Sequence, residues 1–313
     1  MKEMISVVVP LYNEEAVIDE LIARLKATLE KTGLIYEIIL VNDGSKDRTL
    51  QLAREYCRKD NLIRLVSFSR NFGHQIAVTA GLDKAKGDAV VLIDADLQDP
   101  PEVIEEMVVK WREGYEVVYG ARSKREGETF FKRITAKLFY RLFRKLTPID
   151  IPLDTGDFRL MDRRVVNELN RMLERNRFLR GMVSWVGFRQ IKVEYVRQPR
   201  FGGDTKYPLR KMINFAMDGL LSFSSVPLRI SSAFGMFCSL VSFGFIAYGL
   251  IVKILFPNHA ISGWASTFVA VLFIGGVQMV TIGILGEYIG RIYDEVKGRQ
   301  LYVVDEELNF ESQ

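Results

Sequence analysis

Two long runs without a charged residue constrain this chain more than any other feature of its sequence. The first covers the 22 residues 231–252 and the second the 23 residues 264–286. At about 1.5 Å per helical residue, each would cross the roughly 30 Å hydrocarbon layer of a bilayer. Both runs are longer than usual core helices, which favours two membrane-spanning helices over a buried hairpin in a soluble protein.

The charges around these runs predict their orientation. Basic residues lie before the first run and after the second, whereas the connecting segment offers little beyond Lys253. By the positive-inside rule, both ends of the hairpin are expected in the cytoplasm. The apolar run 5–9 is cut short by Pro10 and polar residues, unlike a signal peptide, so the front of the chain is expected on the same side.

Overall composition excludes some classes of protein. A formal net charge of +4 over 313 residues is too small to argue for nucleic-acid binding. The two cysteines, Cys57 and Cys238, fall in a polar helical pattern and in an apolar run, so neither a disulfide framework nor a zinc site is expected.

The first 120 residues alternate between strand-like and helix-like patterns. This alternation predicts a mostly parallel α/β sheet with helices on both faces. In such sheets ligands lie at the carboxyl ends of strands, and polar residues at 10–14, 42–45 and 94–96 follow three of the expected strands. The expected strands are 5–9, 36–41, 62–68, 89–93 and 116–119, with helices near 14–32, 46–58, 74–85 and 100–113.

Two amphipathic segments lie between the sheet and the hairpin. Residues 130–146 place basic and apolar side chains on opposite faces of a helix, which suits either the lipid headgroup layer or a surface helix packed on the sheet. The neighbouring hairpin favours the membrane role. Residues 207–223 form a second candidate helix, an elbow between the sheet and the bilayer.

Acidic residues at the strand ends are the strongest chemical signal. Asp94 and Asp96, with the amide of Gln98, can offer hard oxygen ligands to Mg²⁺ or Mn²⁺, although such a pair also occurs in ordinary turns and caps. Asp43 can accept hydrogen bonds from a nucleobase or close a turn. A P-loop lysine motif and a G-x-G-x-x-G after the first strand are both missing, so P-loop phosphotransfer and dinucleotide redox chemistry lose support.

These segments resemble family 2 glycosyltransferases of the dolichol-phosphate mannose synthase type. The resemblance covers nearly the whole chain, and the hairpin with its ending is most similar to bacterial polyprenyl-phosphate (bactoprenol) glucosyltransferases. It implies a GT-A fold, a nucleotide-sugar donor, Mg²⁺ or Mn²⁺, and inversion at the sugar. The segments that carry it are VPLYNEE (9–15), VNDGS (41–45), DADLQDPP (94–101), GDFR (156–159) and GEYIGRIY (286–293).

The resemblance also assigns site residues. It implies that Pro10, Tyr12, Glu14 and Asp43 hold the nucleotide, that Asp94, Asp96 and Gln98 handle metal and diphosphate, and that Asp157 is the catalytic carboxylate facing the acceptor. Whether Asp157 is a base or an orienting group stays open. Arg122, Arg200 and Lys206 are candidates for the acceptor phosphate, and Arg70 for the donor crevice; His74 is given no catalytic role.

The resemblance implies sugar transfer onto undecaprenyl phosphate for cell-envelope glycosylation, with glucose from UDP-glucose as the first choice by resemblance alone. Mannose, amino sugars and 4-amino-arabinose are alternative sugars, and a membrane nucleotide-sugar sensor without turnover is the rival from another class. The resemblance also implies a homo-oligomer, tetrameric in relatives, and a flippase partner. The expected organisation is a cytoplasmic catalytic domain (1–205), an interfacial elbow (206–228), two transmembrane helices (229–287) and a cytoplasmic tail (288–313) in the plasma (inner) membrane.

Overall fold

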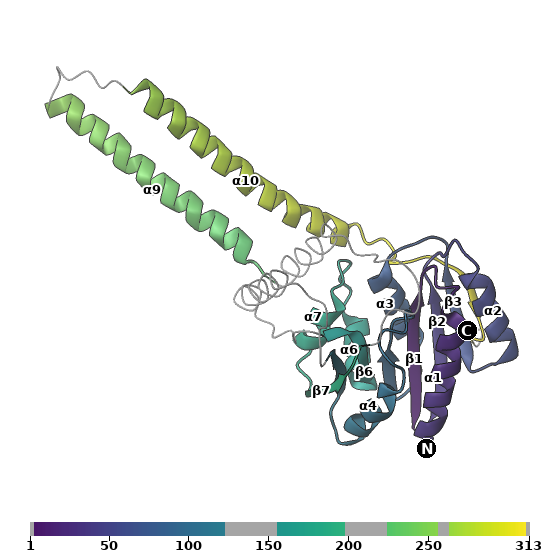
Figure 1. Ribbon diagram of the computed structural model, residues 1–313. Helices are drawn as coiled ribbons and strands as arrows, with labels where there is room; N and C mark the ends of the chain where they lie inside the picture. Colours follow the sequence, from purple (N-terminus) through teal and green to yellow (C-terminus); the bar gives the residue numbers. More distant parts are fainter. Residues whose placement is uncertain (1–2, 123–154, 198–223, 256–262, 311–313) are drawn as a thin grey trace.

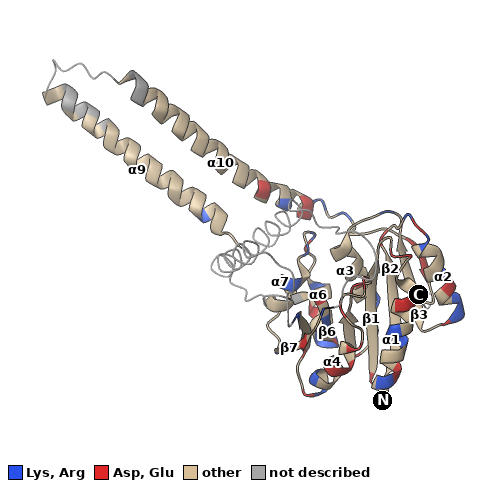
Figure 2. Ribbon diagram, in the orientation of Figure 1, with Lys and Arg blue, Asp and Glu red and all other residues tan. Residues whose placement is uncertain are grey.

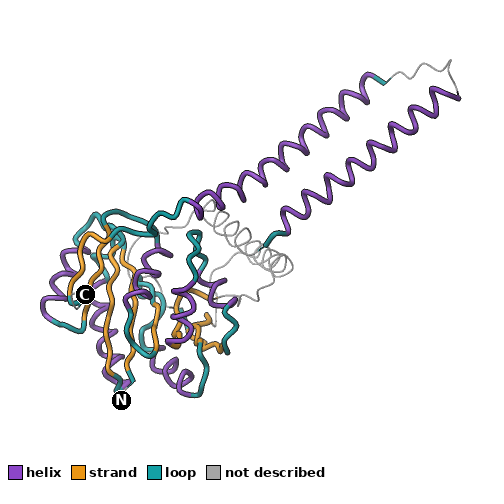
Figure 3. Tube along the Cα trace, turned by 180° about the vertical axis from the view of Figure 1, so that it is seen from behind, coloured by secondary structure: helices purple, strands orange, loops and turns teal. Residues whose placement is uncertain are grey.

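The computed structural model consists of an α/β domain from which two long helices project together (Figures 1 and 3). The structure describes residues 3–122, 155–197, 224–255 and 263–310. The expected helices at 130–146 and 207–223 lie outside these ranges, as do Arg200 and Lys206.

One eight-stranded sheet forms the centre of the α/β domain, in the order β7-β5-β6-β4-β1-β2-β3-β8. The five strands expected from the sequence are confirmed, and β1 to β5 and β7 all run in one direction. The mostly parallel sheet is thus confirmed, while β6 and β8 run against it. The strands are β1 (Met4–Leu11), β2 (Ile35–Asn42), β3 (Ile63–Phe68), β4 (Ala89–Leu92), β5 (Val117–Arg122), β6 (Thr155–Asp162), β7 (Gln190–Tyr195) and β8 (Val304–Leu308).

Helices cover both faces of the sheet and enclose two apolar cores. Successive residues of a strand point to opposite faces, so Val7 packs in the core beneath α1, α2 and α4, and Val8 in the core beneath α3, α6 and α7. The helices are α1 (Ile18–Thr32), α2 (Thr49–Lys59), α3 (His74–Lys84), α4 (Val103–Arg112), α6 (Arg163–Arg171) and α7 (Leu179–Trp185).

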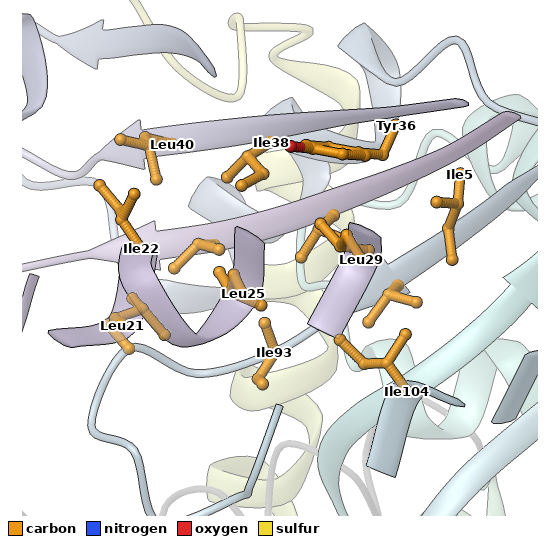
Figure 4. Close-up of a cluster of buried hydrophobic side chains, with 14 of the residues drawn as sticks. Ile5, Leu21, Ile22, Leu25, Leu29, Tyr36, Ile38, Leu40, Ile93 and Ile104 are labelled. Atoms are coloured by element: carbon orange, nitrogen blue, oxygen red, sulfur yellow. The ribbon is translucent and has the colours of Figure 1, made fainter. Parts of the chain in front are cut away.

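Helix α1 shows how the sequence specifies this packing. Leu21, Ile22, Leu25 and Leu29 recur at helical spacing, are buried, and face the sheet (Figure 4). Full burial of one such side chain contributes about 1.5–3 kcal/mol. The helix ends at Gly33, whose φ of 67° is a left-handed conformation that glycine adopts without steric cost.

Strand β6 lies antiparallel between β4 and β5, in the middle of the sheet. Its first residues are polar and include Gly156, a pattern typical of a loop, but they form a strand. The side chains of Asp157 and Arg159 are buried, and Arg159 donates to the carbonyl oxygens of Gly156 and Asp157. Internal hydrogen bonds of this kind make a charged strand in a sheet interior possible.

The end of the chain, expected to be a tail, returns to the sheet as β8. Val304–Leu308 pairs antiparallel with β3, and the Tyr302 ring stacks on Phe68 with 5.0 Å between centroids. The Asn309 amide nitrogen donates to the carbonyl oxygens of Cys57 at 2.7 Å and Ile63 at 2.8 Å. The segment that follows the hairpin is therefore fastened to the edge of the domain.

The two projecting helices, α9 (Val226–Leu255) and α10 (Trp264–Val296), are long and apolar enough to cross a membrane. The charged residues that Figure 2 colours on these helices gather where the helices leave the domain. At that end the Tyr288 hydroxyl donates to the Ser224 carbonyl at 2.6 Å, and the Arg175 backbone N–H donates to Glu295 Oε1 at 2.7 Å. These bonds join the hairpin to itself and to the loop between α6 and α7.

The Asn309 contacts give a stability prediction. Asn309→Ala should lower the free energy of unfolding by about 1–2 kcal/mol, because two carbonyl acceptors lose their donor and alanine must adopt the φ of 62° found at this position. Thermal unfolding in detergent measures the change. Asn176→Ala, at an exposed position, is the matched control. Equal melting temperatures for the two variants would contradict a fastening role for Asn309.

Candidate functional site

The carboxyl ends of β1, β2 and β4 meet at one edge of the sheet. The N–H of Asp43 donates to the Leu11 carbonyl at 2.9 Å, and that of Ile93 to the Val8 carbonyl at 3.2 Å. The chain starts β1 at the far end of the domain, so this edge faces the hairpin (Figure 1). The three polar segments predicted to share a crevice are therefore brought together.

Hydrogen bonds join the loop after β1 to the start of α2 and the residues before it. Asn13, with a positive φ of 55°, accepts from the Lys46 N–H at 2.8 Å, and the Glu14 N–H donates to Thr49 Oγ1 at 2.8 Å. Of the residues expected to hold a nucleotide, Pro10 is buried in β1, whereas Tyr12 and Glu14 are half-buried in this loop.

Asp43 is buried at the end of β2, with 3% of its surface exposed. Its carboxylate accepts from the backbone N–H of Phe72 at 2.6 Å, that of Gly73 at 3.0 Å and the Asn71 amide at 2.9 Å. Burial raises the pKa of this carboxyl, and the backbone donors oppose the rise. The contacts shown for Asp43 thus fix the 71–73 loop, and its expected contact with the nucleotide stays a prediction.

The Asp94–Gln98 segment forms a tight turn after β4. Asp96 Oδ1 accepts from the Gln98 N–H at 3.1 Å, and Leu97 has a positive φ of 55°. Asp94 Oδ1 is buried and has no hydrogen-bond partner among the described residues. Burial and the nearby acids raise the pKa of Asp94 to about 6, although His74 opposes them.

The expected metal ligands are not all turned toward one point. The Gln98 amide oxygen accepts from Arg197. Within the described ranges, no group of three or more His, Cys, Asp or Glu side chains is arranged to hold a metal ion. Asp94 and Asp96 are then the remaining acidic pair, and the Asp94 oxygen without a hydrogen bond suits a cation.

Asp157 is the centre of an ionic cluster built from three elements. His74 Nε2, from the start of α3, lies 3.2 Å from Asp157 Oδ2, and Arg180 Nε, from α7, lies 2.7 Å from Oδ1. Burial acts to raise the pKa of Asp157, but Arg180 and His74 outweigh it and hold the pKa well below its usual range. Asp157 is therefore an ionised carboxylate with both oxygens engaged.

Sequence reasoning missed His74 and Arg180. His74 was given no catalytic role, but it is the first residue of α3 after the capping residue Gly73, and its ring contacts acids. Its position after the loop that follows β3, at the carboxyl edge of the sheet, could have indicated a site residue. Arg180 gave none, because it comes from a separate short helix.

Asp99 was a further residue without an assigned role. It is buried, accepts from the Tyr195 hydroxyl, and lies 3.7 Å from the Arg122 guanidinium. The contact places Arg122, a candidate for the acceptor phosphate, beside the turn that holds Asp94 and Asp96. Arg70 is exposed, with its guanidinium 3.9 Å from the centre of the Phe72 ring.

Comparison with known proteins now identifies the class. Residues 6–169 match the family described as Glycosyl transferase family 2, so the chain belongs to that family. The mixed sheet, with acids at its carboxyl edge, is its GT-A fold. More particularly, residues 226–292 match the GtrB C-terminal hairpin. The resemblance found in the sequence is confirmed, and the protein is a glycosyltransferase.

Full-length relatives share both parts. An uncharacterized glycosyltransferase, YkcC, of Bacillus subtilis (strain 168) is 54% identical over 98% of this chain and 95% of its own length. A prophage bactoprenol glucosyl transferase homolog of Escherichia coli (strain K12) is 44% identical over 96% of this chain and 98% of its own length. The bactoprenol glucosyl transferase of Shigella phage SfII is 44% identical over 96% and 97%.

The packing of Gly44 against the 71–73 loop can be tested. A Cβ at Gly44 would lie 2.5 Å from the Arg70 carbonyl carbon and the Asn71 nitrogen, whereas a Cβ at Gly33 would meet nothing within 4 Å. Both glycines have similar positive φ values, 64° and 67°. Gly33→Ala should therefore cost about 1–2 kcal/mol for its backbone alone, and Gly44→Ala about 1–3 kcal/mol more.

Thermal unfolding of the two variants gives the comparison. Because the φ penalty is shared, the difference between their melting temperatures reports the clash with the loop. Equal melting temperatures would mean that the loop yields without resistance.

Proposed function

We propose that the protein transfers a sugar from a nucleotide diphosphate donor to a polyprenyl phosphate, with glucose from UDP-glucose and undecaprenyl phosphate as first choices. The names of the 44% identical relatives support a bactoprenol acceptor and a glucosyl group. The observation that carries the proposal is the convergence of Asp94 and Asp157, joined by His74, at the sheet edge facing the hairpin.

The donor side of the site is proposed at Asp94 and Asp96, with Tyr12, Glu14 and Arg70 along the nucleotide. Mg²⁺ is commonly held by one or two carboxylates together with substrate phosphates and water. Asp94 and Asp96 are the residues that would hold Mg²⁺ or Mn²⁺, and the buried Asp94 oxygen without a hydrogen bond supports this role. When bound, the metal supplies positive charge to the departing diphosphate.

Asp157 is proposed to orient the acceptor rather than to act as a general base. Arg180 and His74 occupy its two oxygens, and its pKa is held low, so it has little affinity for a proton. A monoesterified phosphate has a second pKa of about 6 and is largely dianionic near neutrality. The attacking oxygen thus needs no base, and cations that place it contribute more.

The proposed reaction is a single displacement with inversion. A phosphate oxygen of the lipid bonds to C1 of the sugar from one face, while the bond from C1 to the diphosphate oxygen breaks on the other and the nucleoside diphosphate leaves. Arg122, beside Asp99, is proposed to contact the acceptor phosphate, together with Arg200 and Lys206 from the sequence. No covalent enzyme intermediate is required.

The hairpin is proposed to keep the site at the cytoplasmic surface of the plasma membrane. A lipid acceptor confined to that surface meets the site at a raised effective concentration. A homo-oligomer and a flippase partner are proposed from the resemblance. The rival function is a nucleotide-sugar sensor without turnover, and product formation separates it from the enzyme.

A reconstituted assay tests the transfer. Purified protein, undecaprenyl phosphate and UDP-glucose with Mg²⁺ or Mn²⁺ should give a lipid phosphate-sugar, detected by mass spectrometry and absent with EDTA. Asp96→Asn and Asp157→Asn should each lower kcat by about 100-fold or more, because charges facing the transition state are lost. Asp305→Asn, on the exposed side of β8, is the matched control.

Other outcomes are equally specific. Product with another nucleotide sugar alone would keep the reaction and replace glucose. Donor binding without product from any donor would favour the sensor.

A further inference from the structure

His74 forms ion pairs with both Asp94 and Asp157. Among the ion pairs of the described residues, no other side chain links these two carboxylates. Its Nε2 lies 3.2 Å from Asp157 Oδ2 and 3.6 Å from Asp94 Oδ1. A carboxylate accepts hydrogen bonds, so Nε2 carries the proton and donates to Asp157. The ring is 35% exposed, against 7% for Asp157, and therefore stands at the border between the domain interior and the crevice.

We propose that His74 is a positioning residue that holds the acceptor-side carboxylate of Asp157 at a fixed place relative to the donor-side carboxylate of Asp94. This inference rests on the proposed transfer reaction and assigns a role within it. His74 acts through Asp157, which it orients from the side opposite Arg180.

Hydrogen bonds of the two preceding residues to Asp43 fix the backbone at His74, and this restricts the position of the His74 ring. Helix α3 begins at His74, directly after Gly73, whose N–H donates to Asp43 at 3.0 Å. The Phe72 N–H donates to the same carboxylate at 2.6 Å. Because Asp43 ends β2 beside the expected nucleotide segment, the donor loop and Asp157 are joined through residues 72–74.

Gln75, the next residue of α3, adds contacts to Asp157 and to α7. The Gln75 amide nitrogen lies 3.5 Å from Asp157 Oδ2, and its oxygen accepts from the Leu179 N–H at 3.1 Å. Leu179 starts the helix that carries Arg180. Helix α3 thus contacts Asp157 directly and also sets the helix that supplies its second cation. Without His74, Arg180 would keep Asp157 in the interior but would no longer fix its spacing from Asp94.

Two substitutions at this position separate positioning from packing. His74→Gln keeps an N–H donor near the place of Nε2, whereas His74→Leu keeps a side chain of similar size without a donor. We expect kcat of transfer to fall about 10- to 100-fold in His74→Leu, the effect of losing a hydrogen bond to a charged group. His74→Gln should stay within about 3-fold of wild type, with donor Kd unchanged in both. His259→Gln, at the other histidine of the chain, is the matched control.

Equal losses in the Gln and Leu variants, or no loss in either, would overturn the proposal, because the donor would then be irrelevant. A parallel loss of donor affinity would also overturn it, since His74 would then act on the nucleotide. The wild-type assay decides the proposed function by itself, from whether product forms.

A second measurement tests the contact without any turnover. Melting temperatures are compared for wild type, His74→Leu, Asp157→Asn and the double variant. If His74 acts on Asp157, the shift caused by His74→Leu should be smaller in the Asp157→Asn background than in wild type. Additive shifts would overturn the proposed link, whatever sugar or acceptor the enzyme uses.

Discussion

The buried carboxylate of Asp43 is the interaction on which the site depends. A carboxyl group that is almost fully buried is tolerated only with internal hydrogen-bond partners, and the 71–73 loop supplies three N–H groups. Satisfying that carboxylate fixes the path of the loop, and with it the first turn of α3. The geometry around Asp157 therefore depends on a group at the end of β2, three strands away in the sheet.

Most of the fold could be predicted from local pattern. Apolar alternation in β1 to β5 and helical spacing in α1 to α4 are encoded in short windows. The two antiparallel strands could not be found in this way. Asp157 and Arg159 make β6 look like a loop, and Asp305, Glu306 and Glu307 make β8 look like a solvated tail. Both become strands because distant partners complete their hydrogen bonding, which no short window contains.

The site, like the fold, could be predicted from the sequence only where its residues belong to a local pattern. The acids after β4 follow a strand in sequence, and Asp157 was found through resemblance to a family. The partners that give these acids their properties are remote: His74 lies 83 residues from Asp157, and Tyr195 lies 96 residues from Asp99. Because such contacts form only in the folded chain, sequence reasoning found Asp94, Asp96 and Asp157 but not His74 or Arg180, which contact Asp157.

The position of β8 has a consequence for the order of biosynthesis. Residues 304–308 follow both apolar helices in the sequence, so β8 can pair with β3 only after both helices have been made. Until then the edge of β3 has exposed N–H and C=O groups, the kind of edge that pairs with other chains. A nascent chain thus holds an unfinished sheet until its hairpin has been made. Pairing with β8 closes this edge, so completion of the sheet is coupled to synthesis of the whole hairpin.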